Sequence, residues 1–356
     1  MPVTDFRTQT DRKNRKKTEG ILKVLPPYMK EYLDSLDLQY KSEGTIYIYF
    51  SRDKVLFEYL GKIFGKKSEE ITEADLDQVT PELVEMFLAD VKRKSINGYR
   101  KKKGSSLNNY LSAVRSFFSY AKSRGMIKRN PAAEIRRVRQ PVKDDVVHID
   151  REEEPAFLNA IENGQGLTPK QEAFRTEYSS MRDDAICQTI LMTGVRVSEL
   201  VGIDIDDVNF SLHQIHIFRK EGKDSHVYMP DSLEALLEKY MTIRNATFHG
   251  KIGKALFLVA VGKYRGARLS VRSVQNIVKK YAKASGVSDA ALITPHRLRA
   301  TFAMDLLEAT SDLSLTQQAL SHQSPSTTAV YIGKRERELK KNRNVLERER
   351  IFQNAP

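Results

Sequence analysis

Two short segments in the second half of the chain place arginine at helical spacing from a glutamate and from a histidine. "TGVRVSEL" carries Arg196 and Glu199, and "TPHRLRATF" carries His296 and Arg299. The Thr-Pro pair before His296 predicts a helix start, so His296 and Arg299 lie on one face of its first turn. A helix N-terminus attracts anions, and a guanidinium binds phosphate oxygens with two parallel hydrogen bonds. Each segment alone is as typical of a surface ion pair or a helix cap as of a binding site.

Two further segments add a lysine and a hydroxyl group. A Gly-containing turn carries Lys220 and Lys223, and "LSHQSPSTTAVY" carries His322 and Tyr331. A tyrosine hydroxyl, with a pKa of ~10, can act as a nucleophile where a base and cations help it to ionise. Solvated turn lysines and a core tyrosine are the common alternatives. Taken together, the four segments hold no carboxylate pair and no set of metal ligands. They predict metal-independent phosphoryl transfer through a phosphotyrosine, without a cofactor and with catalysis by positioning and charge.

The elements around these segments are mostly helical. Apolar residues recur at helical spacing over 151–163, 181–193, 231–244, 270–285, 296–309, 312–321 and 325–332. The exception is "HQIHIFRKEGKDSHVYMP", two β-rich stretches around a turn, which predicts a hairpin. "KALFLVA" predicts a short strand. The second half therefore reads as a helical domain with a small antiparallel sheet.

The first half predicts a separate bundle of helices. Apolar residues follow helical spacing from Ile21 onward, a second helix fits 45–60, and Thr80 and Pro81 begin another. A strong helix ends at Gly125, and "RRVRQPVKDD" reads as an extended basic linker. We expect a lead-in at 1–20 that is flexible or a short helix, a helical domain at 21–140, a linker at 141–148, a second domain with the four segments at 149–333 and a C-terminal tail at 334–356.

Composition excludes several classes of protein. The chain has 356 residues, and a length of this size suits two domains of about 150 residues each. Its single cysteine, Cys187, excludes a disulfide framework and suits a reducing compartment. No apolar run reaches the ~18 residues that span a bilayer, and the N-terminus lacks a signal-peptide pattern. The sequence therefore predicts a cytoplasmic protein without a membrane partner.

The positive charge is concentrated in two segments. The chain holds 59 Lys and Arg against 46 Asp and Glu, a net charge of +13. Residues 92–143 hold 16 basic residues and one acidic residue, and residues 251–300 hold 11 and one, so the remainder is acidic. Two such segments favour a nucleic-acid partner over a solvated face. The candidate DNA-binding residues are Lys92, Arg93, Lys94, Arg100, Lys101, Lys102, Lys103, Arg115, Lys122, Arg124, Arg265, Arg268 and Arg272.

The order and spacing of the four segments resemble a known family. Arg, Lys, His-x-x-Arg, His and Tyr follow one another over residues 196–331, as in the catalytic boxes of the tyrosine recombinases, or phage integrases. Residues 21–140 look like the helical core-binding domain of that family. Within it, "LPPYMKEYLDSL", "IFRKEGKDSHVYM", "YMTIRN" and "ALFLVAVGKYRG" are similar to the Xer recombinases that act as a single protein.

The resemblance implies a role for each catalytic position. Tyr331 would attack the scissile phosphate and form a 3′-phosphotyrosyl bond, leaving a free 5′-hydroxyl. Arg196 and Arg299 would hold the non-bridging oxygens, and His322 would donate a further hydrogen bond to them.

The resemblance assigns proton transfer to the remaining catalytic positions. His296 would accept the proton of the tyrosine, and Lys220, with Lys223 as the alternative, would protonate the leaving oxygen. Glu199 would orient the site. The chain departs from the family at Ala300, where a histidine is usual, and this concerns packing behind the site.

The resemblance also implies the architecture and the partners. The fold would be mainly α-helical with a small antiparallel sheet, in two domains forming a C-shaped clamp around double-stranded DNA. The target would be a specific inverted-repeat site, and a homotetramer would assemble on two sites through the C-terminal tail. An accessory protein, a DNA translocase or an excision factor, is a further partner. Chromosome dimer resolution and mobile-element integration both fit. The alternatives are a non-catalytic helix-turn-helix regulator and a type IB topoisomerase.

Overall fold

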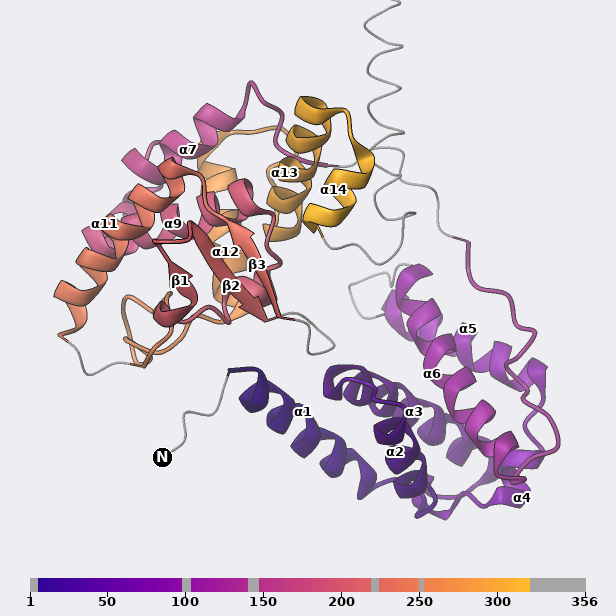
Figure 1. Ribbon diagram of the computed structural model, residues 1–356. Coiled ribbons are helices and arrows are strands. Elements are labelled where there is room, and N and C mark those ends of the chain that lie inside the picture. The colour runs from indigo at the N-terminus through magenta and orange to yellow at the C-terminus, as the bar shows by residue number, and fades with distance from the viewer. Residues whose placement is uncertain (1–5, 98–103, 140–146, 219–223, 250–252, 321–356) are drawn as a thin grey trace, which may run out of the picture. The chain divides into compact units, whose positions relative to one another are not determined.

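The chain forms two compact units, residues 1–142 and 143–356. The computed structural model describes residues 6–97, 104–139, 147–218, 224–249 and 253–320. Helices dominate both units, and the second unit also holds a three-stranded antiparallel sheet (Figure 1). The mainly helical class with a small antiparallel sheet is thereby confirmed. None of the described helices is both long and apolar enough to cross a membrane.

The first unit is built from helices alone in its described part. Within the expected lead-in at 1–20 and just beyond it, residues 6–22 form a helix. Arg15 on this helix bonds Asp37 at 2.7 Å, and Thr18 is fully buried. The predicted start at Thr80 and Pro81 is confirmed, because Thr80 Oγ1 accepts from the Leu83 backbone N–H. The elements are α1 Phe6–Leu22, α2 Met29–Leu38, α3 Glu43–Phe64, η1 Ser68–Glu70, α4 Glu73–Asp77, α5 Pro81–Asn97 and α6 Gly104–Ser123.

Aromatic packing fills the core of the first unit. The Phe117 ring on α6 lies edge-on to Phe57, with centroids 5.3 Å apart, and to Tyr32 at 5.5 Å. Such pairs add to the stabilisation that comes from burying their area. Asp53 is the exception: it is fully buried beside these rings, and neither carboxylate oxygen has a hydrogen-bond partner in the described structure. Burial raises the pKa of the Asp53 carboxyl well above its usual range.

The second unit packs its helices around α9, which is buried on almost every side. Helices α7, α11 and α13 contact α9, and the sheet begins after α10 (Figure 1). The elements are α7 Glu154–Asn163, α8 Pro169–Ala173, α9 Glu177–Thr193, α10 Val197–Leu200, η2 Ile205–Asp207, β1 Val208–Asn209, β2 Gln214–Phe218, β3 Asp224–Tyr228, α11 Asp231–Phe248, α12 Val271–Ser285, α13 Pro295–Thr310 and α14 Leu313–Leu320. The helix predicted at 325–332 lies outside the described residues.

The predicted hairpin is confirmed, and the predicted strand in "KALFLVA" is not. Strand β2 pairs with β1 and with β3, each antiparallel, and Ile215 opposite Val227 faces the core. The segment around "KALFLVA" forms only two isolated bridges. Side chains satisfy its backbone instead, because Arg244 donates to the carbonyls of Gly253, Ala255 and Leu256.

Candidate active site

A glycine turn sets the position of the first candidate arginine. Helix α9 ends at Gly194, whose φ of +64° lies in the left-handed region. A Cβ at this position would also overlap the ring of Phe302 on α13. Only glycine meets both demands, so α13 lies directly against the turn that leads to Arg196.

Arg196 is held by Glu199 from two directions. Glu199 Oε2 accepts from the Arg196 backbone N–H at 2.8 Å, and Oε1 accepts from its Nη1, also at 2.8 Å. The Glu199 side chain is 6% exposed, whereas that of Arg196 is 39% exposed. A buried carboxylate thus fixes the start of α10 and orients a guanidinium that reaches the surface. The orienting role of Glu199 in catalysis stays a prediction.

His296 lies in the first turn of α13, as the sequence predicts, and its ring reaches the surface. Surrounding atoms nevertheless remove part of its solvation, and this burial lowers the pKa of the imidazole below its usual range. The charges of Arg297, Arg299 and Arg196 lower that pKa further. Arg196 and Arg299 therefore lie close enough to act electrostatically on His296, so the structure brings these three candidates together. A neutral imidazole at neutral pH can accept a proton.

Arg299 is buried, with 3% of its surface exposed. Its Nη1 donates to the carbonyl of Gly194 and its Nη2 to the carbonyl of Leu320. These bonds tie the ends of α9 and α14 to α13 and fix the plane of the guanidinium.

The other predicted catalytic residues fall outside the described residues. Lys220 and its alternative Lys223 belong to 219–223, between β2 and β3, and His322 and Tyr331 belong to 321–356. Their flanks are described. Strands β2 and β3 bracket the lysines, and Leu320, whose carbonyl accepts from Arg299, directly precedes the segment with His322 and Tyr331.

Sequence analysis missed the side chains that support this site. Phe302 packs against the Gly194 turn, and Thr301 Oγ1 accepts from the Ile149 backbone N–H at 3.0 Å. Arg182 donates to the Leu258 carbonyl at 2.9 Å. One feature of the sequence could have pointed to Arg182. In α9, arginine and aspartate lie among the apolar residues of a buried helix, and buried charges need partners.

Comparison with known families decides the identity of this fold. Residues 149–338 match the phage integrase family, and residues 29–125 match the N-terminal SAM-like domain of phage integrases. The chain belongs to the phage integrase family of tyrosine recombinases. The first match covers the candidate site, and the second covers α2 to α6.

Individual relatives of this recombinase are Xer proteins. The tyrosine recombinase XerC of Roseiflexus castenholzii is 33% identical over 263 residues, 71% of this chain and 74% of the relative. The XerS protein of Streptococcus thermophilus is 29% identical over 341 residues, 88% of this chain and 94% of the relative. Among solved structures, the XerH recombinase in a post-cleavage complex with palindromic difH has a TM-score of 0.64 at 21% identity, covering 86% of this chain and 81% of that one. A lambda integrase dimer on a COC' core site has a TM-score of 0.58 at 18% identity, covering 86% and 77%. These two structures share the fold.

The candidate DNA-binding residues of the first unit divide into two kinds. Lys92, Arg93 and Lys122 are exposed on α5 and α6. Arg115 instead donates to the carbonyls of Ala132 and Ile135, so its guanidinium holds the segment after α6. Arg115 thus makes a structural contact, and its predicted DNA contact stays a prediction. The side chain of Lys94 and residues Arg100, Lys101, Lys102 and Lys103 lie outside the described part of the chain.

The second unit of the recombinase shows the same division. Arg272 is exposed in the first turn of α12, and Arg265 is exposed over the Phe248 ring, 4.9 Å from its centroid. Arg268 donates to the carbonyls of Val201 and Ile203 and pairs with Asp204. A guanidinium held by two carbonyls and a carboxylate serves the fold, and the predicted DNA contact of Arg268 stays a prediction.

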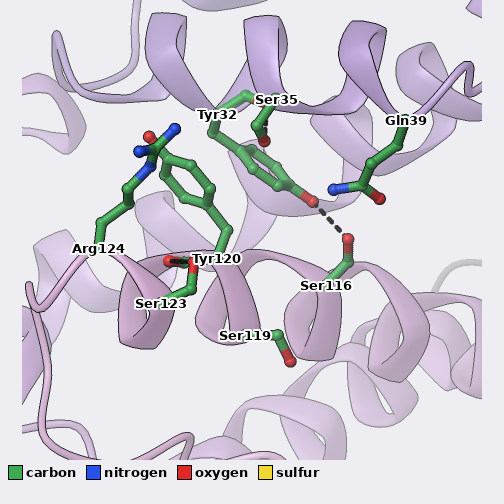
Figure 2. Close-up of a pocket in the computed structure, with 8 residues that line it drawn as sticks. All are labelled: Tyr32, Ser35, Gln39, Ser116, Ser119, Tyr120, Ser123 and Arg124. Atoms are coloured by element: carbon green, nitrogen blue, oxygen red, sulfur yellow. Dashed lines mark hydrogen bonds between the residues drawn. The ribbon is translucent and has the colours of Figure 1, made fainter.

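A polar groove of about 390 Å³ lies between α2 and α6 in the first unit (Figure 2). Tyr32 Oη donates to Ser116 Oγ at 2.8 Å, and the Ser35 and Ser123 hydroxyls donate to backbone carbonyls of their own helices. Arg124, a candidate DNA-binding residue, lies beside the Tyr120 ring at the end of this groove (Figure 2). The groove contains none of the candidate catalytic side chains.

Proposed function

We propose that this chain is a site-specific recombinase that cuts and rejoins DNA strands through a covalent bond between Tyr331 and a 3′-phosphate. One arrangement carries the proposal: Arg196, oriented by the buried Glu199, acts on a His296 whose pKa is lowered, at the N-terminus of α13. This arrangement offers a phosphodiester one exposed cation, the N–H groups of a helix end and a proton acceptor.

The reaction conserves bonds and needs no oxidant or nucleotide. The Tyr331 hydroxyl loses its proton to His296 as its oxygen attacks phosphorus. The bond from phosphorus to the 5′-oxygen then breaks, and Lys220 gives that oxygen a proton. Arg196, with Arg299 and His322, stabilises the negative charge on the non-bridging oxygens. Attack by another 5′-hydroxyl reverses the steps and joins a new strand.

The biological role that we propose is chromosome dimer resolution in the cytoplasm. Support comes from the Xer relatives, since XerS of Streptococcus thermophilus matches 88% of this chain. The DNA target would be an inverted repeat, bound by a homotetramer across two sites with an accessory translocase. Integration or excision of a mobile element is the alternative. It has support from the likeness in fold to the integrase of the Tn1549 transposon, with a TM-score of 0.57 at 18% identity.

Tyr331→Phe is the decisive test of the nucleophile. The wild type is expected to form a covalent adduct on a nicked suicide substrate, and the variant should bind this DNA equally well without forming the adduct. Tyr264→Phe, at an exposed tyrosine, is the matched control and should form the adduct normally. An adduct in Tyr331→Phe would overturn the assignment. Strand exchange between two sites separates a recombinase from a type IB topoisomerase, and any adduct excludes a non-catalytic regulator.

The pH dependence of cleavage tests the role of His296. Because the pKa of His296 lies below its usual range near ~6.5, the ring should stay neutral, and cleavage should persist, at lower pH than for an unperturbed histidine. Single-turnover cleavage should then fall as pH drops through that lowered pKa. In Arg297→Gln the removal of a neighbouring charge should move the fall toward higher pH. An unchanged profile in Arg297→Gln would argue that another group accepts the proton.

Chelation tests the proposed independence from metal ions. The positive charge that the transition state needs is supplied by arginine and histidine side chains of the chain itself. Adduct formation in excess EDTA should therefore equal that in the presence of Mg²⁺. A loss of more than about tenfold in EDTA, restored by Mg²⁺, would contradict this part of the proposal.

A further inference from the structure

Helix α1 is basic, although it lies outside the two positive segments at 92–143 and 251–300. Its residues 6–22 hold six Lys and Arg against two acidic residues. The helix lies against α3 (Figure 1), and it precedes residues 29–125, which match the SAM-like domain. The charge of α1 is therefore not explained by that match.

One face of α1 packs on the rest of the first unit. Arg15 pairs with Asp37 of α2 at 2.7 Å and with Glu43 of α3 at 3.4 Å. Thr18 is fully buried, and Leu22 packs against the core. These three positions of α1 recur at helical spacing, so they form a single stripe along the helix. The contacts of this stripe fix which side of α1 faces outward.

The outward face carries four exposed cations, Arg12, Lys13, Lys16 and Lys17. Lys17 lies over the Tyr47 ring, 4.8 Å from its centroid. Among the described residues, no carboxylate forms an ion pair with Arg12, Lys13 or Lys16. The four cations form two pairs at a spacing of four residues, where like charges repel each other and destabilise a helix. A polyanion bound to this face would remove that repulsion.

We propose that the outward face of α1 binds the phosphate backbone of double-stranded DNA. The duplex carries one negative charge per about 1.7 Å of its axis. Arg12 and Lys16 are separated by about 6 Å along the helix, so each can neutralise a different phosphate. Such contacts add affinity that does not depend on the base sequence. The choice of DNA as the polyanion rests on the proposed function.

Two other anionic partners fit this face less well. The core of a protein–protein interface is rich in aromatic and apolar side chains and poor in lysine. Residues 12–20 of α1 include no aliphatic or aromatic residue. A helix that lies on a membrane buries an apolar face in the lipid. The side of α1 that carries Thr18 and Leu22 is instead packed on its own unit.

The salt dependence of binding to a fluorescent, mixed-sequence duplex tests the proposal. The full chain carrying Arg12→Gln, Lys13→Gln and Lys16→Gln together is the α1 variant. Its slope of log affinity against log salt should be smaller than that of the wild type by about two to three. Its affinity should be at least tenfold lower at about 50 mM salt, and this deficit should shrink as salt rises to about 200 mM.

Two controls separate contact with DNA from a change in net charge or in folding. Lys23→Gln, Lys30→Gln and Lys67→Gln together remove the same charge from exposed positions elsewhere in the first unit, and should change the slope by less than about one. Exchanging each of the three α1 residues for the other basic residue should preserve the slope. Without DNA, the melting temperature of the α1 variant should be no lower than that of the wild type, because repulsion is removed.

A slope in the folded α1 variant that matches the slope of the control with three changes elsewhere would overturn the proposal. Polyglutamate and vesicles of phosphatidylserine and phosphatidylcholine, each offered in place of DNA, test the two other partners. A loss of binding confined to either of them would also overturn the proposal. The measurement uses intact duplex and needs no cleavage. The absence of a Tyr331 adduct would therefore overturn the proposed function, whereas only an unchanged salt slope or another partner overturns the role of α1.

Discussion

The two units treat a buried aspartate in opposite ways. Asp183 in the second unit accepts from Arg182 at 2.6 Å, from Lys280 at 2.9 Å and from the Tyr281 hydroxyl at 3.1 Å. Asp53 in the first unit is equally buried and has no hydrogen-bond partner in the described structure. Of these two aspartates, Asp183 is thus held by charged hydrogen bonds, whereas Asp53 lies among aromatic rings without such a bond in the described structure.

The difference follows from what each unit has to hold in place. The second unit contains backbone that is neither helix nor strand around residues 253–269, and its carbonyls need donors. Arg182 and Arg244 supply them. Arg268 donates to carbonyls just after α10, and Arg299 does the same for the turn at Gly194. The first unit is helical over most of its described residues, and helices satisfy most of their own backbone. Arg115, near the surface, donates to the carbonyls of the segment after α6. Charged side chains in its core therefore have less to stabilise.

Replacing Asp183 should lower the free energy of unfolding more than any other change proposed below. Asp183→Ala leaves Arg182 and Lys280 without their shared partner, and breaking a buried ion pair costs about 3–5 kcal/mol. The free energy of unfolding, measured with urea, should fall by that amount. Asp183→Asn, which keeps an oxygen acceptor, should lose less. A loss below about 1 kcal/mol in Asp183→Ala would show that the charged network contributes little to the second unit.

Arg268 and Arg272 belong to the same positive segment, but only replacement of Arg268 should lower the stability of the second unit appreciably. Arg268→Ala removes a donor from the carbonyls of Val201 and Ile203 and the charged partner of Asp204, so the free energy of unfolding should drop by about 2–3 kcal/mol. Arg272→Ala, at an exposed position, should change it by less than about 0.5 kcal/mol.

DNA affinity should depend more on Arg272 than on Arg268. Arg272→Ala should reduce the slope of log affinity against log salt by about one, because one phosphate contact is lost. If Arg268→Ala lowers that slope and leaves stability unchanged, then Arg268 contacts DNA as the sequence suggested.

These two arginines also show what could be predicted from the sequence. Both lie in the same positive segment, and nothing in their neighbours distinguishes them. The partners of Arg268 are carbonyls more than 60 residues earlier in the chain, which only the tertiary fold brings near. The start of α13 was predictable because Thr294 and Pro295 signal it locally. The spacing of His296 and Arg299 followed from that start, whereas the contacts of Arg299 with Gly194 and Leu320 did not.

Asp53→Asn tests the first unit, where the expected effect is smaller and of opposite sign. Burial raises the pKa of Asp53 in the folded chain above its value of ~3.9 in the unfolded chain. Between these two values the folded state binds more protons, so the free energy of unfolding of the wild type falls as pH rises. Asparagine does not titrate, so the free energy of unfolding of Asp53→Asn does not fall with pH for this reason.

The advantage of Asp53→Asn should therefore grow from pH ~4 upward and reach on the order of 1 kcal/mol at neutral pH. Urea unfolding at several pH values measures it, with Asp34→Asn at an exposed position of α2 as the control. If Asp53→Asn is instead less stable at neutral pH, the carboxylate has a charged partner, and the two cores are built alike. A gain would mean that the first unit tolerates a destabilising charge that the second unit neutralises with Arg182 and Lys280.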